Sequence, residues 1–300
     1  MTAIVTNFLI FAVLLGDKKL LAKSALIAGC ACSHLLLALN IGISGIMRYV
    51  YRSVMRDPIT PWECVQMVYP IAYPLAFQSS ALLLSVVGVE RLTAVAAPHK
   101  FRTWFSNRAT WCMVGVTFIL ASTSVAVGIS LSVHQPMTSR HCGQPRIFGN
   151  PYTAFGRAAS ATGGTVASIL TIWALVCGTR RIRKLPLLSG EAGKLKKQMQ
   201  LTRAMLSVSF IDFCLVVIPN TISFMAASVD LGRLPSLVGP VQSNIAFCVS
   251  AMSSMFCYLI FNSQFRQAAV KLFCNCTGHE SGSQQQTVQA KGTAWNISRV

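Results

Sequence analysis

The stretch ERLTAVAAP, residues 90–98, places a Glu-Arg pair and then a proline directly after 26 residues, 64–89, that contain no Lys, Arg, Asp or Glu. A helix needs about 20 mostly apolar residues to cross the ~30 Å hydrocarbon core of a membrane. A helix from Cys64 to Arg91 would reach roughly 40 Å at about 1.5 Å per residue. The sequence therefore predicts a membrane span that ends at the charged pair Glu90-Arg91.

The composition of the whole chain indicates a membrane protein. Its mean hydropathy is +0.55, and 53% of its residues are hydrophobic while only 11% are charged. Soluble domains carry about a quarter of charged residues. We expect an all-α membrane protein, a seven-transmembrane helix bundle with a short amphipathic eighth helix. The expected spans are 2–16, 24–47, 64–91, 109–133, 154–179, 201–229 and 236–262.

The first apolar segment, residues 2–16, is shorter than the others. Fifteen helical residues reach roughly 22 Å, less than the hydrocarbon core. Either the chain lacks the true start of this helix, or the helix thins the bilayer around it. Basic residues follow the segment and none precedes it, so a signal anchor is favoured over a cleaved signal peptide.

The formal net charge of +18 is explained by membrane orientation. With the N-terminus outside, 19 of the 26 Lys and Arg residues fall on the cytoplasmic side. This excess is the positive-inside pattern, and it predicts a multi-pass plasma-membrane protein with its C-terminus in the cytoplasm. Anionic lipids of the inner leaflet are then the expected partners of the basic loops, and nucleic acid is not.

The cysteines predict one disulfide. Of the 11 cysteines, only Cys64 and Cys142 fall at extracellular positions in this topology, where the compartment is oxidising. We expect these two to pair, and two free loop thiols are the alternative. Most of the others lie inside the expected helices, where cysteine packs as a small hydrophobic residue.

The end of the chain predicts a membrane-surface helix followed by a tail. Residues 263–273 alternate apolar and polar side chains in the pattern of a helix that lies on the inner leaflet. Cys274 and Cys276 follow it and are candidates for palmitoylation. A zinc site that uses them with His279 is a much weaker alternative, and we expect no metal and no cofactor.

The polar residues 277–300 are expected to form a disordered cytoplasmic tail. Its last three residues, Ser298-Arg299-Val300, fit a carboxylate-terminal peptide for a PDZ domain. A three-residue match arises more often by chance.

Several spacings resemble those of rhodopsin-like (class A) G-protein-coupled receptors over nearly the whole chain. They are Asn7 in the first span, LIAGCACSHLL (26–36) in the second, Glu90, Arg91, Ala94 and Pro98 after the third, Phe213 and Pro219 in the sixth, and Tyr258 and Phe265 at the end of the seventh. The resemblance implies a receptor that activates a heterotrimeric G protein. It assigns coupling and switch roles to Glu90, Arg91, Pro98, Phe213, Pro219 and Tyr258.

The same resemblance places a ligand pocket between the outer halves of the helices. Tyr73 stands where amine receptors carry an Asp, so an amine ligand is disfavoured, and a neutral or weakly polar small molecule or a short peptide is expected. Asn220, Phe224 and Asn244 would also face this pocket. Tyr73 and Phe77 share one helix face by their spacing, although ordinary core packing explains that stripe equally well.

The chain also departs from the family pattern. Leu92 replaces a Tyr, Val217 a Trp, and Ser254-Met255 an Asn-Pro pair. His34 replaces the Asp of the second span, which implies that no sodium ion binds there. This mixture is similar to that of divergent invertebrate receptors, especially the nematode chemoreceptors.

Asp212 is the one carboxylate well inside an expected span. An unpaired charge at that depth costs at least about 2.5–3.5 kcal/mol. We expect Asp212 to face the bundle and act in the switch, with His34, Ser253 or Ser254 as its partner. A protonated, merely tolerated carboxyl group is the alternative.

The sequence also bears on three alternative functions. A retinal protein is excluded because residues 234–264 contain no Lys for a Schiff base. A small-solute transporter would need more intramembrane ionisable groups or an inverted repeat. A receptor relative that keeps the fold without signalling is the stronger rival, and no sequence pattern suggests an enzyme.

Overall fold

The computed structural model describes residues 2–54, 60–67, 69–132, 144–184, 190–228 and 245–276, and within these ranges the chain is helical with no strand. The elements are α1 (Thr2–Gly16), α2 (Lys18–Lys23), α3 (Ala25–Val54), α4 (Pro61–Gln66), α5 (Tyr69–Ala96), α6 (Pro98–Trp104), α7 (Asn107–Ser132), α8 (Gln144–Lys184), α9 (Gly190–Asp212), η1 (Phe213–Val217), α10 (Ile218–Ser228), α12 (Phe247–Phe261) and α13 (Ser263–Cys276).

Five stretches in the described part of the chain are long and apolar enough to cross a membrane. They are Ala25–Met47, Pro70–Ala96, Asn107–Leu131, Pro151–Lys184 and Gln198–Ile222. Two shorter apolar helices, α1 and α12, accompany them. Residues 229–244, which include the expected start of the last span, lie outside the described residues. The structure thus shows an all-helical membrane protein with five candidate spans, and a bundle of seven spans stays a prediction.

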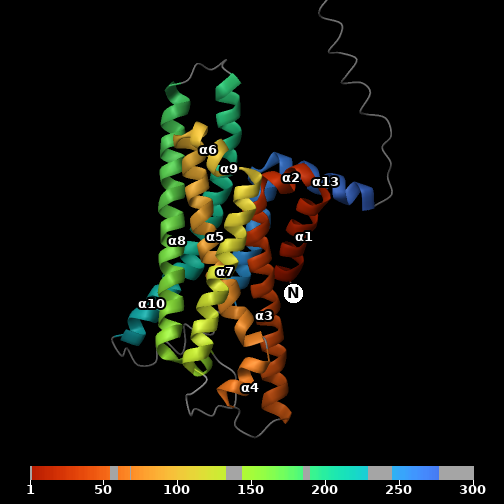
Figure 1. Ribbon diagram of the computed structural model, residues 1–300. Coiled ribbons are helices and arrows are strands. Elements are labelled where there is room, and N and C mark those ends of the chain that lie inside the picture. Colours follow the sequence, from red (N-terminus) through yellow and green to blue (C-terminus); the bar gives the residue numbers. More distant parts are fainter. Residues whose placement is uncertain are drawn as a thin grey trace, which may run out of the picture.

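Helix α5 lies at the centre of the bundle, between α3, α7 and α8 (Figure 1). One end of the bundle carries α2, α6 and α13, and the opposite end carries α4, α10 and the C-terminal end of α3 (Figure 1). We refer to these as the α6 end and the α4 end. Since α5 runs from one end to the other, it contributes residues to sites at both depths.

Small residues bring α5 and α8 unusually close. A Cβ atom built on Gly163 of α8 would lie 3.1 Å from the carbonyl oxygen of Ala81, and one built on Gly88 of α5 would lie 3.2 Å from that of Ala167. Membrane helices associate through such small residues because the hydrophobic effect does not draw them together inside lipid. The seam between α5 and α8 therefore fixes the position of the central helix.

The helix expected to begin at Cys64 is interrupted, and that expectation is corrected. Cys64 belongs to the short helix α4, which starts at a capping box formed by Thr60 and Glu63, and α5 begins separately at Tyr69. Pro70 explains the break, because a proline lacks an N–H and its ring clashes with the carbonyl four residues earlier, so it is tolerated in the first turn of α5 but not inside a continuous helix. At its other end α5 continues past Arg91 to Ala96, and Pro98 begins α6.

The α4 capping box also sets the charge of Glu63. The Thr60 backbone N–H donates to the Glu63 carboxylate at 2.8 Å, and the Thr60 hydroxyl donates at 2.9 Å. These hydrogen bonds, the backbone one first, lower the pKa of Glu63, whose carboxyl group is fully exposed. The cap is therefore a local device at the α4 end.

The expected helix 201–229 also contains a break. Residues Phe213–Val217 form a π-helical turn between α9 and α10, in which the Ile218 N–H donates to the Phe213 carbonyl. Pro219 accounts for it, since a proline lacks an N–H and its ring clashes with the carbonyl four residues earlier. Side chains of the next turn bind two other carbonyls of this turn: Asn220 donates to Val216 O and Thr221 to Val217 O, both at 2.9 Å. We call this turn the η1 bend.

Two further helices differ in length or shape from the expectation. The described helix that ends at Lys184 contains a turn at Gly149, where φ is 75° and a glycine is favoured, and its long straight part starts at Pro151. The surface helix α13 extends to Cys276 rather than ending at Phe273. Phe265 and Ala269 are buried on its inner face, against the bundle core that contains Ile10 of α1 and Tyr258 of α12.

Candidate functional site

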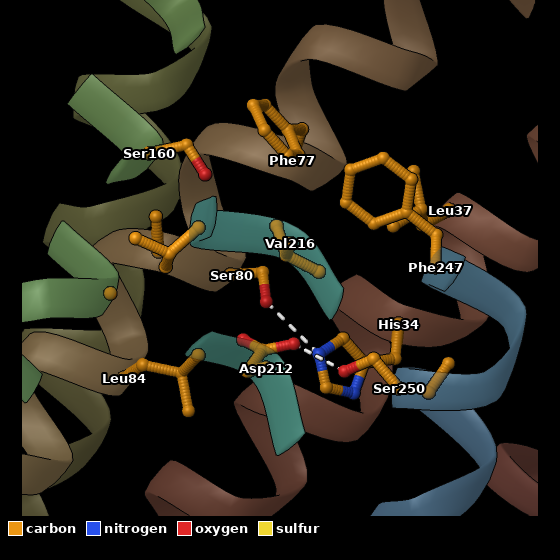
Figure 2. A pocket seen from close by; sticks show the side chains of 14 residues that line it. His34, Leu37, Phe77, Ser80, Leu84, Ser160, Asp212, Val216, Phe247 and Ser250 are labelled. Carbon is orange, nitrogen blue, oxygen red and sulfur yellow. Dashed lines mark hydrogen bonds between the residues drawn. The ribbon is translucent and has the colours of Figure 1, made fainter. Parts of the chain in front are cut away.

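The middle of the bundle contains a cluster of polar side chains that joins four helices. His34 Nε2 of α3 lies 3.0 Å from the Ser80 hydroxyl of α5, and one residue earlier Ser33 and Ser79 make a second such contact at 3.0 Å. Ser250 of α12 donates a hydrogen bond to the carboxylate of Asp212, at the end of α9. Figure 2 shows Asp212 beside the His34 ring, and its dashed lines mark the Ser80–His34 and Ser250–Asp212 hydrogen bonds. We call His34, Ser80, Asp212 and Ser250 the central cluster.

The central cluster borders a small cavity of about 20 Å³, whose wall also includes Ser160 of α8. A cavity needs at least about 10–15 Å³ to hold one water molecule. The space is therefore large enough for a single water among several hydroxyl groups, and too small for an organic ligand.

An aromatic layer closes the cavity on its α4 side. Phe77 of α5 and Phe247 of α12 both line the cavity, with ring centroids 5.2 Å apart in an edge-to-face arrangement. Tyr73 stacks on Phe77 at 6.0 Å and meets the edge of Phe247 at 6.2 Å. A molecule that enters from the α4 end thus meets Tyr73 before it reaches the polar cluster.

The α6 end holds a second, much larger cavity, of about 650 Å³. Glu90 and Arg91 lie in its wall, and the Arg91 guanidinium binds both Glu90 carboxylate oxygens, at 2.5 and 3.2 Å. Much of the remaining polar wall consists of neutral amides: Asn107, Gln198, Gln200, Asn262, Gln264 and Gln267. We call this space the α6-end cavity.

The residues predicted for coupling fall into two groups. Glu90 and Arg91 line the α6-end cavity, and Pro98 begins α6 at the same end. Tyr258 lies buried near this end, where its hydroxyl is 3.8 Å from the sulfur of Met205. Asp212, Phe213 and Pro219 instead belong to the η1 bend and its borders.

The predicted pocket residues are only partly described. Tyr73 and Phe77 lie in the aromatic layer, and Asn220 is buried with its amide bonded to Val216 O. Phe224 lies in α10, but its side chain is outside the described residues, as is all of Asn244. The ligand pocket therefore stays a prediction.

Cysteine positions are also known in part. Cys64 is buried and disulfide-bonded, while Cys142 lies outside the described residues, so their pairing stays a prediction. Cys274 is exposed and not disulfide-bonded, and it lies in the last turn of α13 rather than after the helix. Cys276 is the last residue of α13, and its side chain is outside the described part, as is His279. In the described ranges, no three His, Cys, Asp or Glu side chains gather into a metal-binding group.

The partner of Asp212 differs in part from the expectation. His34 is its neighbour as predicted, but the hydrogen bond comes from Ser250, one turn before Ser254. Ser253 instead donates to the Ser250 carbonyl, and the Ser254 hydroxyl has no hydrogen-bond partner within the described chain. His34 takes the place of the family's Asp in the second span, but α9 supplies the carboxylate of Asp212 at the same depth.

Ser80, Ser160 and Ser250 were not predicted from the sequence as site residues. Ser79-Ser80 lie 46 residues after Ser33-His34 on a different helix, so no local pattern links the two pairs. One signal could have found them: these serines are polar residues inside long, uncharged and mostly apolar runs.

Comparison with known proteins identifies the family. No curated protein matches the chain. The family described as serpentine type 7TM GPCR chemoreceptor Srsx, a nematode chemoreceptor type, matches residues 1–273, which is most of the 300-residue chain. This match confirms the resemblance to G-protein-coupled receptors that the helix motifs indicated. The chain belongs to the serpentine type 7TM GPCR chemoreceptor family Srsx.

Proposed function

We propose that this chemoreceptor binds an extracellular small molecule or short peptide near its α4 end and activates a heterotrimeric G protein at its α6 end. The observation that carries the proposal is the α6-end cavity with Arg91 in its wall. In this proposal the α6 end lies in the cytoplasm and the N-terminus outside, in the plasma membrane. The excess of Lys and Arg in the loops at the α6 end supports this orientation.

The size of the α6-end cavity fits the end of one partner helix. One helical turn with its side chains occupies roughly 500 Å³, from a diameter of about 10–12 Å and a pitch of 5.4 Å. The cavity of about 650 Å³ therefore holds about one turn.

The chemistry of the cavity wall favours the C-terminal end of such a helix. The last carbonyl groups of a helix have no partner within it, and a terminal carboxylate adds a negative charge. Side-chain amides can donate to those carbonyls, and the Arg91 guanidinium can bind the carboxylate. In the structure Arg91 is held by Glu90, which makes this form the resting state in our proposal.

The proposed route between the two ends runs through the η1 bend. A ligand that moves Tyr73 or Phe247 shifts the aromatic layer, which lies directly on the central cluster. The central cluster ends at Asp212, where α9 meets the η1 bend. Residues Gln198, Gln200 and Leu201, in the middle of α9, line the α6-end cavity, so a change of bend alters the cavity wall.

The test is G-protein nucleotide exchange in membranes that contain the chain, measured against panels of small molecules and peptides. Arg91→Ala is expected to abolish both basal and ligand-driven exchange. Arg108→Ala is the matched control, since Arg108 is an exposed cation on α7 that does not line the α6-end cavity. Equal activity of wild type and Arg91→Ala would contradict the proposal, as would equal losses in both variants.

A receptor relative without signalling is the second candidate. Leu92, Val217 and Ser254-Met255 replace residues on which the family's switch depends, which favours this reading. Correct surface expression with no nucleotide exchange under any condition would support it. A transporter is disfavoured, because His34 and Asp212 are the only ionisable pair placed in the middle of the bundle among the described residues.

A further inference from the structure

The two ionisable groups of the central cluster come from different helices. His34 belongs to α3 and Asp212 to α9, and each is hydrogen-bonded to a serine rather than to the other. Figure 2 shows the carboxylate and the imidazole side by side, with Ser80 and Ser250 flanking them. Both side chains line the same small cavity.

The surroundings of Asp212 offer little to balance a negative charge. An ionised carboxylate can accept about four hydrogen bonds, and the described residues supply one donor, Ser250. The other helices that border the cavity contribute the neutral hydroxyls of Ser80 on α5 and Ser160 on α8. On α3 the remaining titratable neighbour is the buried Cys30 thiol, which cannot carry a positive charge.

His34 is therefore the one side chain described around Asp212 that can become a cation. The pair is electrically neutral when the two groups together hold one proton, either as a carboxylate beside an imidazolium or as two neutral groups. Without that proton, a bare carboxylate is buried in the bundle, which is strongly unfavourable at membrane depth. Charge balance thus predicts that the two side chains share one proton.

The cavity supplies a place for that proton to move. A water molecule in the space of about 20 Å³ can contact the pair and the surrounding hydroxyls. Water-mediated hydrogen bonds are nearly as favourable as direct ones.

We propose that His34 and Asp212 form a proton-binding site inside the bundle, and that the bound proton stabilises the η1 bend as it stands in this structure. Asp212 is the last residue of α9, and the η1 bend begins at the next residue. Loss of the proton leaves a bare carboxylate and draws water into the cavity, which disturbs the packing around the bend. This second half rests on the proposed function, whereas the proton site itself does not.

The first experiment tests the proton site without any G protein. Infrared absorption of a protonated carboxyl group is recorded on the purified chain in lipid vesicles, over the range of about pH 5 to 8 in which histidine-linked sites titrate. The wild-type band is expected to weaken as the pH rises. Asp212→Asn is expected to lack the band, and Glu63→Gln, which alters an exposed carboxyl group, to keep it.

A second variant keeps this test decisive if Asp212→Asn does not fold. Ser250→Ala removes the donor to the carboxyl group but leaves the carboxyl group in place, so the band is expected to shift in frequency without being lost. A band that stays unshifted in Ser250→Ala, or one that persists in a folded Asp212→Asn, would overturn the assignment. So would a band that is insensitive to pH but responds when choline is replaced by sodium, because the ligand would then be a metal cation.

The second experiment links the site to signalling. Nucleotide exchange by wild type is expected to change over the same pH range, and Asp212→Asn, which mimics the protonated group, to lose this dependence and keep the acid-side rate throughout. Identical pH profiles would overturn the coupling. A titrating infrared band with no exchange at any pH would leave the proton site in place and contradict the proposed function instead.

Discussion

The central cluster and the α6-end cavity each contain one acid and one base, arranged in opposite ways. In the cluster, the acid and the base come from helices α9 and α3, and the α12 serine bonds to the acid. In the cavity, Glu90 and Arg91 are neighbours on the same helix and bond to each other. The first arrangement ties helices together, whereas the Glu90–Arg91 pair joins no two helices.

The largest predicted effect is the loss of the partner that balances Asp212. His34→Leu should destabilise the purified chain by about 3 kcal/mol, because it leaves an uncompensated acid in the bundle. It is measured as the fall in apparent melting temperature. The double variant His34→Leu with Asp212→Leu is expected to recover most of the loss, since apolar residues can replace a buried pair. Equal losses in the single and double variants would show that His34 does not balance the charge of Asp212.

The seam between α5 and α8 should give the next largest effect. Gly163→Val introduces a Cβ that would lie 3.1 Å from Ala81 O, and such overpacking typically costs about 1–3 kcal/mol. Gly115→Val on α7 is the matched control, because a Cβ there has nothing within 4 Å. If both variants melt at the wild-type temperature, close approach of α5 and α8 does not hold the middle of the bundle.

The Glu90–Arg91 pair should matter for activity rather than stability. Glu90→Gln frees Arg91 to face a partner and is expected to raise basal nucleotide exchange roughly fivefold, which corresponds to about 1 kcal/mol. The melting temperature is expected to fall less than in His34→Leu, because the variant keeps a polar side chain beside Arg91. A large fall in melting temperature would show instead that this pair also links helices, contrary to the comparison.

The smallest predicted effect is confined to α4. Because hydrogen bonds to Thr60 lower the pKa of Glu63, the contribution of the carboxylate is complete above its ordinary value of 4.5 and is lost as the pH falls through the lowered pKa. Amide hydrogen exchange of residues 62–67, compared with that of Glu63→Gln, measures this loss. The difference between wild type and variant should vanish in acid, while melting of the whole bundle follows neither change. A difference that persists in acid would assign the protection of α4 to something other than the carboxylate.

The sequence predicted those parts of the molecule that depend on composition and local spacing. Long uncharged runs identified five helices, and the Glu90-Arg91 pair marked a site that the structure does place at a cavity. The break before Pro70 and the turn before Pro219 were missed, because the apolar runs continue through both. The Ser250 partner of Asp212 could not be predicted either, since it depends on how α12 is rotated against α9 rather than on any local pattern.

The η1 bend has a consequence for how receptors of this kind can change by insertion and deletion. A π-helical turn holds about one residue more than an α-helical turn, and each residue of an α-helix advances the direction of its side chains by about 100°. Deleting one residue between Phe213 and Val217 would therefore rotate α10 by about 100° relative to α9. Helix α10 would present a different set of side chains, while α9 kept its place in the wall of the α6-end cavity. Deletion of a single codon at this position can thus change the face that α10 presents without changing the residues of α9 that line this cavity.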